Sequence, residues 1–227
     1  MNNTSDLSLF LLTIRGTLAP ATLEAARSVH NQTAGAPANV AVTQSLGDIS
    51  HMVYVPPLKA EKGAGEFLIM DIWNSMDGLN QFFANPQVQH QAGEIFTSRD
   101  PVVWIAAEGF VNYHIPAPFG KNERLVAVVR GKVESIEKAR AIHNAGVSKM
   151  INLAHKAGDL THEAYFRLAA PGSPEALEFF AVDVWMSHEG MHDFYDQPEF
   201  MQTLDGMFAA EPDFSVWTHP TGDWVEW

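Results

Sequence analysis

The sequence contains no cysteine. This absence excludes a disulfide scaffold, a cysteine-ligated zinc or iron-sulfur site and a cysteine nucleophile. Basic residues are few, because Lys plus Arg number 14 against 27 for Asp plus Glu, and the formal net charge is −13. Such a charge repels phosphate backbones and anionic lipid headgroups, so nucleic acid is not an expected partner.

Long hydrophobic runs are also missing. The apolar run Leu7–Ile14 is too short to span a bilayer, and no basic residue precedes it as a signal peptide requires. We therefore expect no membrane partner and a cytoplasmic location. With 227 residues, 46% of them hydrophobic and 18% charged, the chain can bury the core of one large domain or of two small ones.

An internal duplication organises the whole chain. Matching residues recur in the same order, 111 to 115 positions apart, which is the signature of a tandem duplication and not of a short-period solenoid. The matches include His30-Asn31 with His143-Asn144, Gly47–His51 with Gly158–His162, Tyr54 with Tyr165, Asp71-Ile72-Trp73 with Asp183-Val184-Trp185, Phe82-Phe83 with Phe194-Tyr195, and Trp104 with Trp217.

The duplication predicts two similar domains. We place the first repeat at residues 1–112 and the second at residues 123–227. Residues 113–122, which contain Pro116, Pro118 and Gly120, are the expected linker.

Each repeat shows the same succession of patterns. A β-rich run is followed by a helical pattern, two further strands, a second helical region and a last strand, which is the β-α-β-β-α-β order of a ferredoxin-like unit in the α+β class. Gly35 and Pro37 are expected to break the first helix of the first copy. The expected elements are strands at Leu7–Arg15, His51–Val55, Glu66–Trp73 and around Trp104, with helices starting near Thr22 and Ser75; the second copy has strands at Leu125–Arg130, His162–Leu168, Glu178–Trp185 and around Trp217, with helices starting near Ser135 and Ser187.

Alternation along Glu66–Trp73 predicts where its side chains point. Leu68, Met70 and Ile72 share one wholly apolar face, which we expect beneath the helices, so that Asp71 and Trp73 point the other way. A sheet face rich in aromatic side chains should not stay in water. We therefore expect the two sheets to face each other as an intramolecular α+β barrel around an enclosed cavity.

The element order, the Asp-Ile-Trp and Asp-Val-Trp strands, and the Phe-rich helices followed by Asn85-Pro86 or Gln197-Pro198 resemble the antibiotic biosynthesis monooxygenase-like family of the dimeric α+β barrel superfamily. The resemblance covers residues 7–108 and 123–220 and implies a fused form of the usual dimer. It also implies a cavity for small aromatic or quinonoid molecules. Activities in the family range from cofactor-free oxygenation to haem degradation, so the resemblance indicates the fold more strongly than the reaction.

The candidate site combines a carboxylate, a tyrosine and a tryptophan from each repeat. A carboxylate in an apolar cavity is a good general base, so Asp71 and Asp183 are the candidate bases. Tyr54 and Tyr165 could donate a hydrogen bond to a developing oxyanion, and Trp73 and Trp185 could stack on a substrate. The alternative is that these side chains only fill and stabilise the fold.

Four repeated histidines are further candidates for substrate binding. His143 shares a helix face with apolar residues, and His162 shares a strand face with Ala164 and Phe166, so both should point into the layer between helix and sheet and could meet. His30 and His51 should do the same in the first copy. We favour buried, hydrogen-bonded histidines over a role in substrate binding.

Metal and haem sites have weaker support. Residues 188–192 fit the zinc motif H-E-x-x-H, but the first copy has Met76-Asp77-Gly78-Leu79-Asn80 there, and Gly190 lies inside a short helix. Haem-degrading relatives carry an axial histidine where this chain has Phe83 and Tyr195; His90 is an alternative ligand. We expect no metal and no cofactor.

The leading hypothesis is a cofactor-independent monooxygenase or related enzyme acting on a phenolic or quinonoid small molecule. The alternative is a non-catalytic module that binds a small ligand or assembles with another chain. We expect a monomer with a pseudo-dimeric barrel, and a homodimer remains open. The apolar segment Trp224–Trp227 could pack back on the protein or contact another chain.

Overall fold

The computed structural model describes residues 9–57, 65–115 and 124–227. The chain divides into two compact units, which we describe one at a time. The first comprises residues 1–103 together with 220–227, and the second comprises residues 104–219. Most of the expected linker 113–122 lies outside the described residues, although Tyr113–His114 form a short strand.

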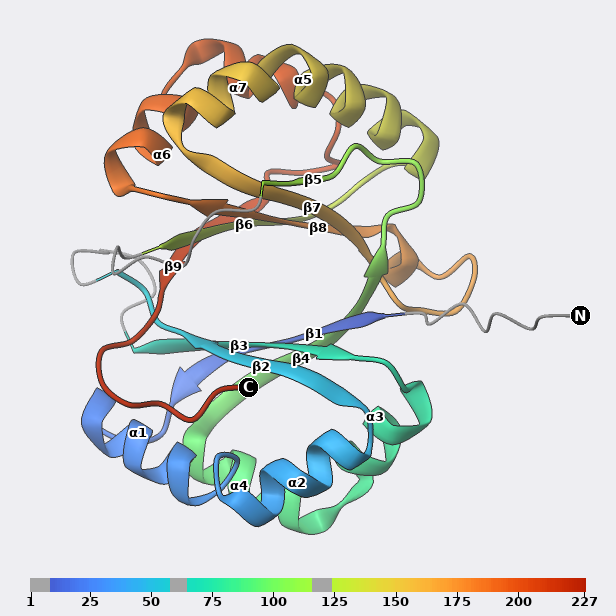
Figure 1. Cartoon of the computed structure of the whole chain (residues 1–227). Helices are drawn as coiled ribbons and strands as arrows, with labels where there is room; N and C mark the ends of the chain where they lie inside the picture. The colour runs from blue at the N-terminus through green and yellow to red at the C-terminus, as the bar shows by residue number, and fades with distance from the viewer. Residues whose placement is uncertain (1–8, 58–64, 116–123) are drawn as a thin grey trace, which may run out of the picture. The chain divides into compact units, whose positions relative to one another are not determined.

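The protein is α+β, with nine β-strands in an antiparallel arrangement and seven α-helices in the described residues. In the first unit the strand order is β2-β3-β1-β4, and the helices cover one face of this sheet (Figure 1). Its elements are β1 (Phe10–Leu18), α1 (Leu23–Gln32), α2 (Pro37–Ser45), β2 (Asp48–Tyr54), β3 (Glu66–Trp73), α3 (Met76–Ala84), α4 (Pro86–Ile95) and β4 (Phe96–Ala106).

The second unit repeats this plan with the strand order β7-β8-β6-β9. The end of β4, from Trp104 to Ala106, also pairs with β7, as does the short strand β5. Its elements are β5 (Tyr113–His114), β6 (Leu125–Lys132), α5 (Ile136–Ala157), β7 (Asp159–Arg167), a 3₁₀ turn (Pro174–Leu177), β8 (Glu178–Trp185), α6 (His188–Tyr195), α7 (Pro198–Thr203) and β9 (Asp213–Thr218). The expected fold class, two ferredoxin-like repeats, is confirmed.

The helices begin where the sequence predicts. Thr22, Ser75, Ser135 and Ser187 are N-caps, and each side-chain oxygen accepts a hydrogen bond from a backbone N–H in the first turn. The expected break is also present, because α1 ends before Gly35 and α2 starts at Pro37, whereas α5 runs unbroken over 22 residues. In the described residues, no helix combines the length and the hydropathy needed to cross a membrane.

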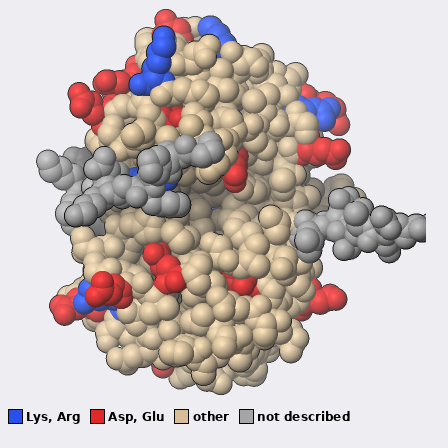
Figure 2. Space-filling model, in the orientation of Figure 1, with Lys and Arg blue, Asp and Glu red and all other residues tan. Residues whose placement is uncertain are grey.

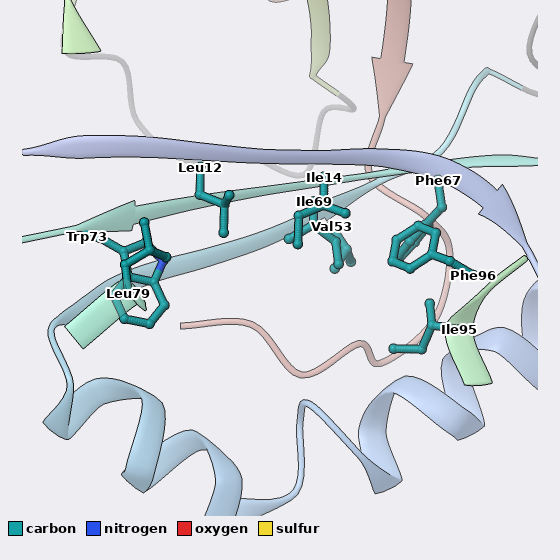
Figure 3. Close-up of a cluster of buried hydrophobic side chains, with 9 residues drawn as sticks. All are labelled: Leu12, Ile14, Val53, Phe67, Ile69, Trp73, Leu79, Ile95 and Phe96. Carbon is teal, nitrogen blue, oxygen red and sulfur yellow. The ribbon is translucent and has the colours of Figure 1, made fainter. Parts of the chain in front are cut away.

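The core of the first unit corrects the prediction about the faces of β3. Trp73 packs with Leu79 of α3, and Phe67 and Ile69 point to the same side as Trp73, toward the helices (Figure 3). In the second unit Trp185 packs in the same way against Met191 and Phe194 of α6. The expectation that Asp71 and Trp73 face away from the helices is therefore wrong. Both alternating faces of β3 are apolar, so alternation alone could not decide which one the helices cover.

Each unit is completed by a segment that follows the last strand of the other repeat. In the first unit, residues 220–227 lie along β2, where His51 N–H donates to Trp227 O over 2.8 Å and Trp227 N–H donates to His51 O over 3.3 Å. In the second unit, residues 107–114 lie along β7, where Tyr113 pairs with His162. The segment Trp224–Trp227 thus packs back on this chain.

Candidate functional site

A chain of hydrogen bonds runs through the interior of the first unit, from α1 across β2 to β3. His30 Nε2 lies 3.0 Å from His51 Nε2, and the two rings stack. His51 Nδ1 lies 2.7 Å from Asp71 Oδ1. All three residues are buried. His51 and Asp71 are direct cross-strand partners, and such partners project from the same face of a sheet.

The two imidazoles differ in protonation. Burial and the neighbouring His51 lower the pKa of His30 to about 4, so His30 is neutral near pH 7. Burial alone would lower the pKa of His51, but the carboxylates, led by Asp71, outweigh it and raise that pKa. His51 therefore favours the imidazolium form, which donates from Nδ1 to Asp71 and from Nε2 to His30.

Asn31 completes the chain and selects the tautomer of His30. The Asn31 amide Nδ2 donates to Asp223 O over 2.7 Å, and its Oδ1 accepts from Val225 N–H over 3.0 Å. These two bonds orient the amide, so that Oδ1 also accepts from His30 Nδ1 over 3.0 Å. With Nδ1 protonated, His30 Nε2 is free to accept from His51. The segment 220–227 thereby holds the histidine pair in place.

A second carboxyl group lies beside this chain. Asp48 is buried, and burial together with the charge of Asp71 raises its pKa to about 8, against the opposing effects of His51, the Ser50 backbone N–H and the Trp227 indole. Asp48 therefore holds a proton at neutral pH. The ring of Trp227 stacks on His51 at a centroid distance of 4.5 Å.

These groups open onto a cavity of about 400 Å³ in the first unit. Asp48, His51, Asp71 and Trp227 line this cavity, and so do further polar side chains, among them Gln91 and Arg99. The break between α1 and α2 contributes Thr33 to the lining. The size is within the range of pockets that hold small organic molecules. Apolar lining residues include Ile14, Val42, Leu46, Ile69, Phe82 and Phe83.

The second unit repeats the hydrogen-bonded chain. His143 Nε2 lies 2.8 Å from His162 Nε2, and His162 Nδ1 lies 2.5 Å from Asp183 Oδ1. Asn144 orients His143 as Asn31 orients His30, through its bonds to Val111 N–H and Gly109 O. The pKa shifts have the same directions as in the first unit. Burial lowers the pKa of His143 to about 4, and Asp183 raises the pKa of His162 against the effect of burial.

Tyrosines distinguish the second unit from the first. The Tyr195 hydroxyl donates to Asp183 Oδ2 over 2.6 Å and accepts from Trp185 Nε1 over 3.2 Å. The Tyr113 hydroxyl donates to Asp159, the counterpart of Asp48. The residue that matches Tyr195 in the first unit is Phe83, which has no hydroxyl. The carboxylate that lines the cavity in the first unit is thus bonded to a protein phenol in the second.

The structure brings together some of the predicted site residues and separates others. Asp71 meets His51 and His30, and the second copy brings Asp183 together with His162 and His143. The predicted meeting of the histidines is confirmed.

The two predicted tyrosines lie elsewhere. Tyr54 and Tyr165 alternate with Val53 and Phe166, whose side chains are in the helix-side cores. They therefore point from the opposite face of the sheet to the carboxylates, and the expected trio of Tyr, Asp and Trp is not assembled.

The metal and haem motifs lie outside this site. His188 and His192 sit in the first turns of α6 with ring centroids 4.4 Å apart, and the described residues contain no group of three side chains suited to hold a metal ion. His90 is exposed on α4, where it pairs with Glu94.

Sequence reasoning did not assign a role to Asp48, Asn31, Tyr195 or Trp227. The first three lie in motifs that the duplication repeats, and this repetition could have marked them as candidates. Asp48 recurs as Asp159, Asn31 recurs as Asn144, and Tyr195 stands at the position of Phe83. Trp227 could be found only from the path of the segment 220–227.

Comparisons with known proteins identify the fold. No protein-family model matches the sequence, and a search of curated proteins finds no match. Among solved structures, an anthrone oxidase-like protein is 16% identical, with a TM-score of 0.60 over 96% of this chain and 93% of that one. The chain has the ferredoxin-like fold of monooxygenase-related proteins. A monooxygenase-like protein from Listeria innocua is 8% identical, with a TM-score of 0.54 over 95% of this chain and 96% of that one. A ferredoxin-fold protein from Listeria monocytogenes, related to antibiotic biosynthesis monooxygenases, is 9% identical, with a TM-score of 0.52 over 97% and 100% of the two chains.

Proposed function

We propose that this protein is a small-molecule oxygenase whose reaction takes place in the first-unit cavity, with Asp71 as the base. The observation that carries the proposal is the buried His51–Asp71 pair at the wall of a cavity of about 400 Å³. The names of its structural neighbours, an anthrone oxidase-like protein and monooxygenase-like proteins, favour a phenolic or quinonoid substrate.

The geometry supplies the elements of proton abstraction. His51 donates to Oδ1 of Asp71 and leaves the other carboxylate oxygen for the substrate. Asp71 takes a proton from the substrate, and the imidazolium of His51 balances the negative charge of the site before that transfer. Apolar side chains such as Ile14, Ile69 and Phe83 line the cavity together with this pair.

The remaining steps are reactions of the substrate carbanion with dioxygen. The carbanion of an anthrone-type methylene is electron-rich and bonds to O₂ to form a hydroperoxide after protonation. Loss of water then leaves a carbonyl. The methylene loses two hydrogens, one oxygen atom enters the product and the other leaves as water, so no external reductant is needed.

Surface charge disfavours an anionic substrate. Acidic side chains lie at several separate places on the face drawn in Figure 2, and basic ones are few there. With a net charge of −13, the protein offers little attraction to anions at long range.

The test is oxygen uptake with anthrone as the probe. We expect Asp71→Asn to lower kcat by at least about 100-fold, because the amide cannot accept the proton. Asp183→Asn is the matched control, since Tyr195 already occupies that carboxylate, and it should leave kcat within about threefold. Circular dichroism and thermal unfolding of both variants show whether the fold is kept.

Two results would overturn the proposal. Equal uptake by the wild-type protein and Asp71→Asn would remove Asp71 as the base. Saturable binding of anthrone without any uptake above the uncatalysed rate would assign the cavity to ligand binding alone.

A further inference from the structure

A second buried acid, Asp48, lines the first-unit cavity beside the His51–Asp71 pair, and the proposed proton abstraction does not use it. Asp48 and His51 are three positions apart on β2, a spacing that would place them on opposite faces of a regular strand. The register of β2 against β3 shifts between Asp48 and Ser50, so that Asp48 lies opposite Trp73 and His51 lies opposite Asp71. Because of this bulge, both acids and the imidazole reach the cavity from the same face of the sheet.

The Asp48 carboxyl offers a hydrogen-bond donor that the described part of the chain does not use. Oδ1 accepts from Ser50 N–H over 3.3 Å, and the described residues give Oδ2 no hydrogen bond of normal geometry. The Trp227 indole lies close enough to oppose the rise in the pKa of Asp48, but its Nε1 has no hydrogen-bond partner among the described residues. Burial and the Asp71 charge raise the pKa of Asp48 to about 8, so its O–H is present near pH 7 beside the Asp71 carboxylate. Two acids that differ in this way provide a base and a hydrogen-bond donor at the same pH.

The second unit closes the equivalent position with a side chain of its own. Asp159 matches Asp48, and the hydroxyl of Tyr113 is hydrogen-bonded to it. Tyr113 lies along β7 at the place that Trp227 takes along β2, and Trp227 has no hydroxyl. The first unit is therefore the copy in which the repeated acid has no phenol partner and lines a cavity of about 400 Å³.

We propose that Asp48 is a second catalytic residue of the first-unit cavity, whose carboxyl O–H donates a hydrogen bond to the carbonyl oxygen of the substrate while Asp71 takes the proton from carbon. This inference rests on the proposed function, because it adds a residue to the same reaction. The C–H bond breaks, its electron pair is delocalised onto the carbonyl oxygen, and the hydrogen bond from Asp48 strengthens as negative charge develops there. Asp48 keeps its proton throughout. Donation to an oxyanion, the role that the sequence suggested for Tyr54, is thereby assigned to an acid on the same strand.

The first test compares variants of the full chain by oxygen uptake with anthrone as the probe. Asp48→Leu removes the donor and should lower kcat by at least about 100-fold, because the loss of one oxyanion donor has an effect of this size. Asp48→Asn retains an N–H donor, since Ser50 N–H holds the amide oxygen, and should recover about tenfold of that loss. Asp159→Leu is the matched control in the second unit and should leave kcat unchanged.

The pH dependence separates Asp48 from the other titratable groups. The charged or titratable side chains that line the cavity are Asp48, His51, Asp71 and Arg99, since α2, α3 and α4 supply only uncharged ones. For the wild-type protein, kcat/KM should fall as pH rises through about 8, where Asp48 loses its proton, and Asp48→Asn should show no fall there. No fall in the wild-type protein, or an equal fall in Asp48→Asn, which would assign the titration to His51, would overturn the proposal. This measurement remains decisive if Asp48→Leu unfolds.

An unreactive ketone reports the hydrogen bond without turnover. 9-Fluorenone is flat and aromatic and has a carbonyl but no acidic C–H, so Asp71 cannot deprotonate it. The infrared stretching frequency of its bound carbonyl should be lower in the wild-type protein than in Asp48→Leu, and Asp159→Leu should leave it unchanged. Equal frequencies in the wild-type protein and Asp48→Leu, or no binding of fluorenone, would overturn the hydrogen bond.

The outcomes separate this inference from the proposed function. If Asp71→Asn abolishes oxygen uptake while Asp48→Leu keeps the wild-type rate, Asp71 remains the base and the role of Asp48 is overturned. If fluorenone shows the Asp48-dependent frequency but anthrone gives no uptake above the uncatalysed rate, the Asp48 donor is retained and the proposed oxygenation is removed.

Discussion

The buried acids of the first unit have different partners. Asp71 is hydrogen-bonded to the imidazolium of His51, while Asp48 lies close to the Asp71 charge and has its pKa raised to about 8. Two adjacent carboxyl groups in a low-dielectric site are most stable when one of them keeps its proton. The site thus holds one ion pair and one neutral acid near pH 7.

This difference predicts how Asp48 affects stability with pH. The folded protein keeps the Asp48 proton up to about pH 8, whereas the unfolded chain releases it near pH 4. The unfolded state therefore binds fewer protons between these values, and the free energy of unfolding falls as pH rises through this window.

Asp48→Asn should remove this fall in the free energy of unfolding with pH. We expect the variant and the wild-type protein to unfold alike near pH 4, and the variant to be more stable by at least about 1 kcal/mol near pH 8. Urea unfolding across this range measures the difference. Asp193→Asn, an exposed change of the same charge, should show no such trend. A stability difference that is constant with pH would contradict the assigned protonation.

At the scale of elements, the break between α1 and α2 is a difference between the first unit and the second. Thr33 and Ala34, which follow α1, and Asn39 in α2 line the cavity, so the interruption contributes to the cavity wall. In the second unit, α5 is continuous, and Met150 and Ala154 pack from it onto Trp185. Gly35 and Pro37 therefore change the site as well as the local backbone.

Helices α3 and α6 approach a neighbouring carbonyl closely through one glycine each. A Cβ at Gly78 would overlap the carbonyl oxygen of Leu46, and one at Gly190 would overlap the carbonyl oxygen of Ala157. These oxygens belong to the backbone, so they cannot move aside without shifting a whole helix end. This contact explains Gly190 in the H-E-x-x-H segment without any metal.

Substitution of Gly190 by alanine should therefore destabilise the protein by at least about 2 kcal/mol, well beyond the gain from helix propensity. A Cβ at Gly93, within α4, would meet no atom within 4 Å, so Gly93→Ala should instead stabilise the protein by up to about 1 kcal/mol. Thermal unfolding of the two variants measures both effects. Equal behaviour of the two would contradict the close approach at Gly190.

At the scale of the whole molecule, the repeats exchange their final segments. Asn31 binds the segment 220–227, and Asn144 binds residues 109–111 in the same way. Val53 N–H donates to Glu226, as Ala164 N–H donates to Asn112. Each histidine pair is therefore anchored by residues that the chain reaches only after completing the other repeat.

Deletion of residues 220–227 should loosen the first unit selectively. His51 N–H and Val53 N–H lose their acceptors, and Trp224 no longer covers His30. We expect amide hydrogen exchange in β2 to accelerate at least tenfold, with β7 unchanged because residues 107–114 remain. Mass spectrometry of peptic fragments reports both strands. Unchanged protection in β2, or equal loss in β7, would contradict a local role for the segment.

The sequence by itself determined the duplication, the order of the elements, the helix starts at Ser75 and Ser187, and the helix break at Pro37. These features depend on local chemistry: capping hydroxyls, the missing N–H of proline and the spacing of apolar residues. The meeting of His143 and His162 was also predictable, because the helix face of one and the strand face of the other both pointed into the same layer.

Only the tertiary structure decided which face of β3 carries Asp71 and Trp73 toward the helices. Apolar side chains lie on both faces of β3, so the alternating pattern is compatible with either face lying beneath the helices. The choice depends on packing against α3 and α4. The path of residues 220–227 and the bond of Tyr195 to Asp183 join residues far apart in the chain or on different elements. Such contacts form through folding in three dimensions, and no local pattern encodes them.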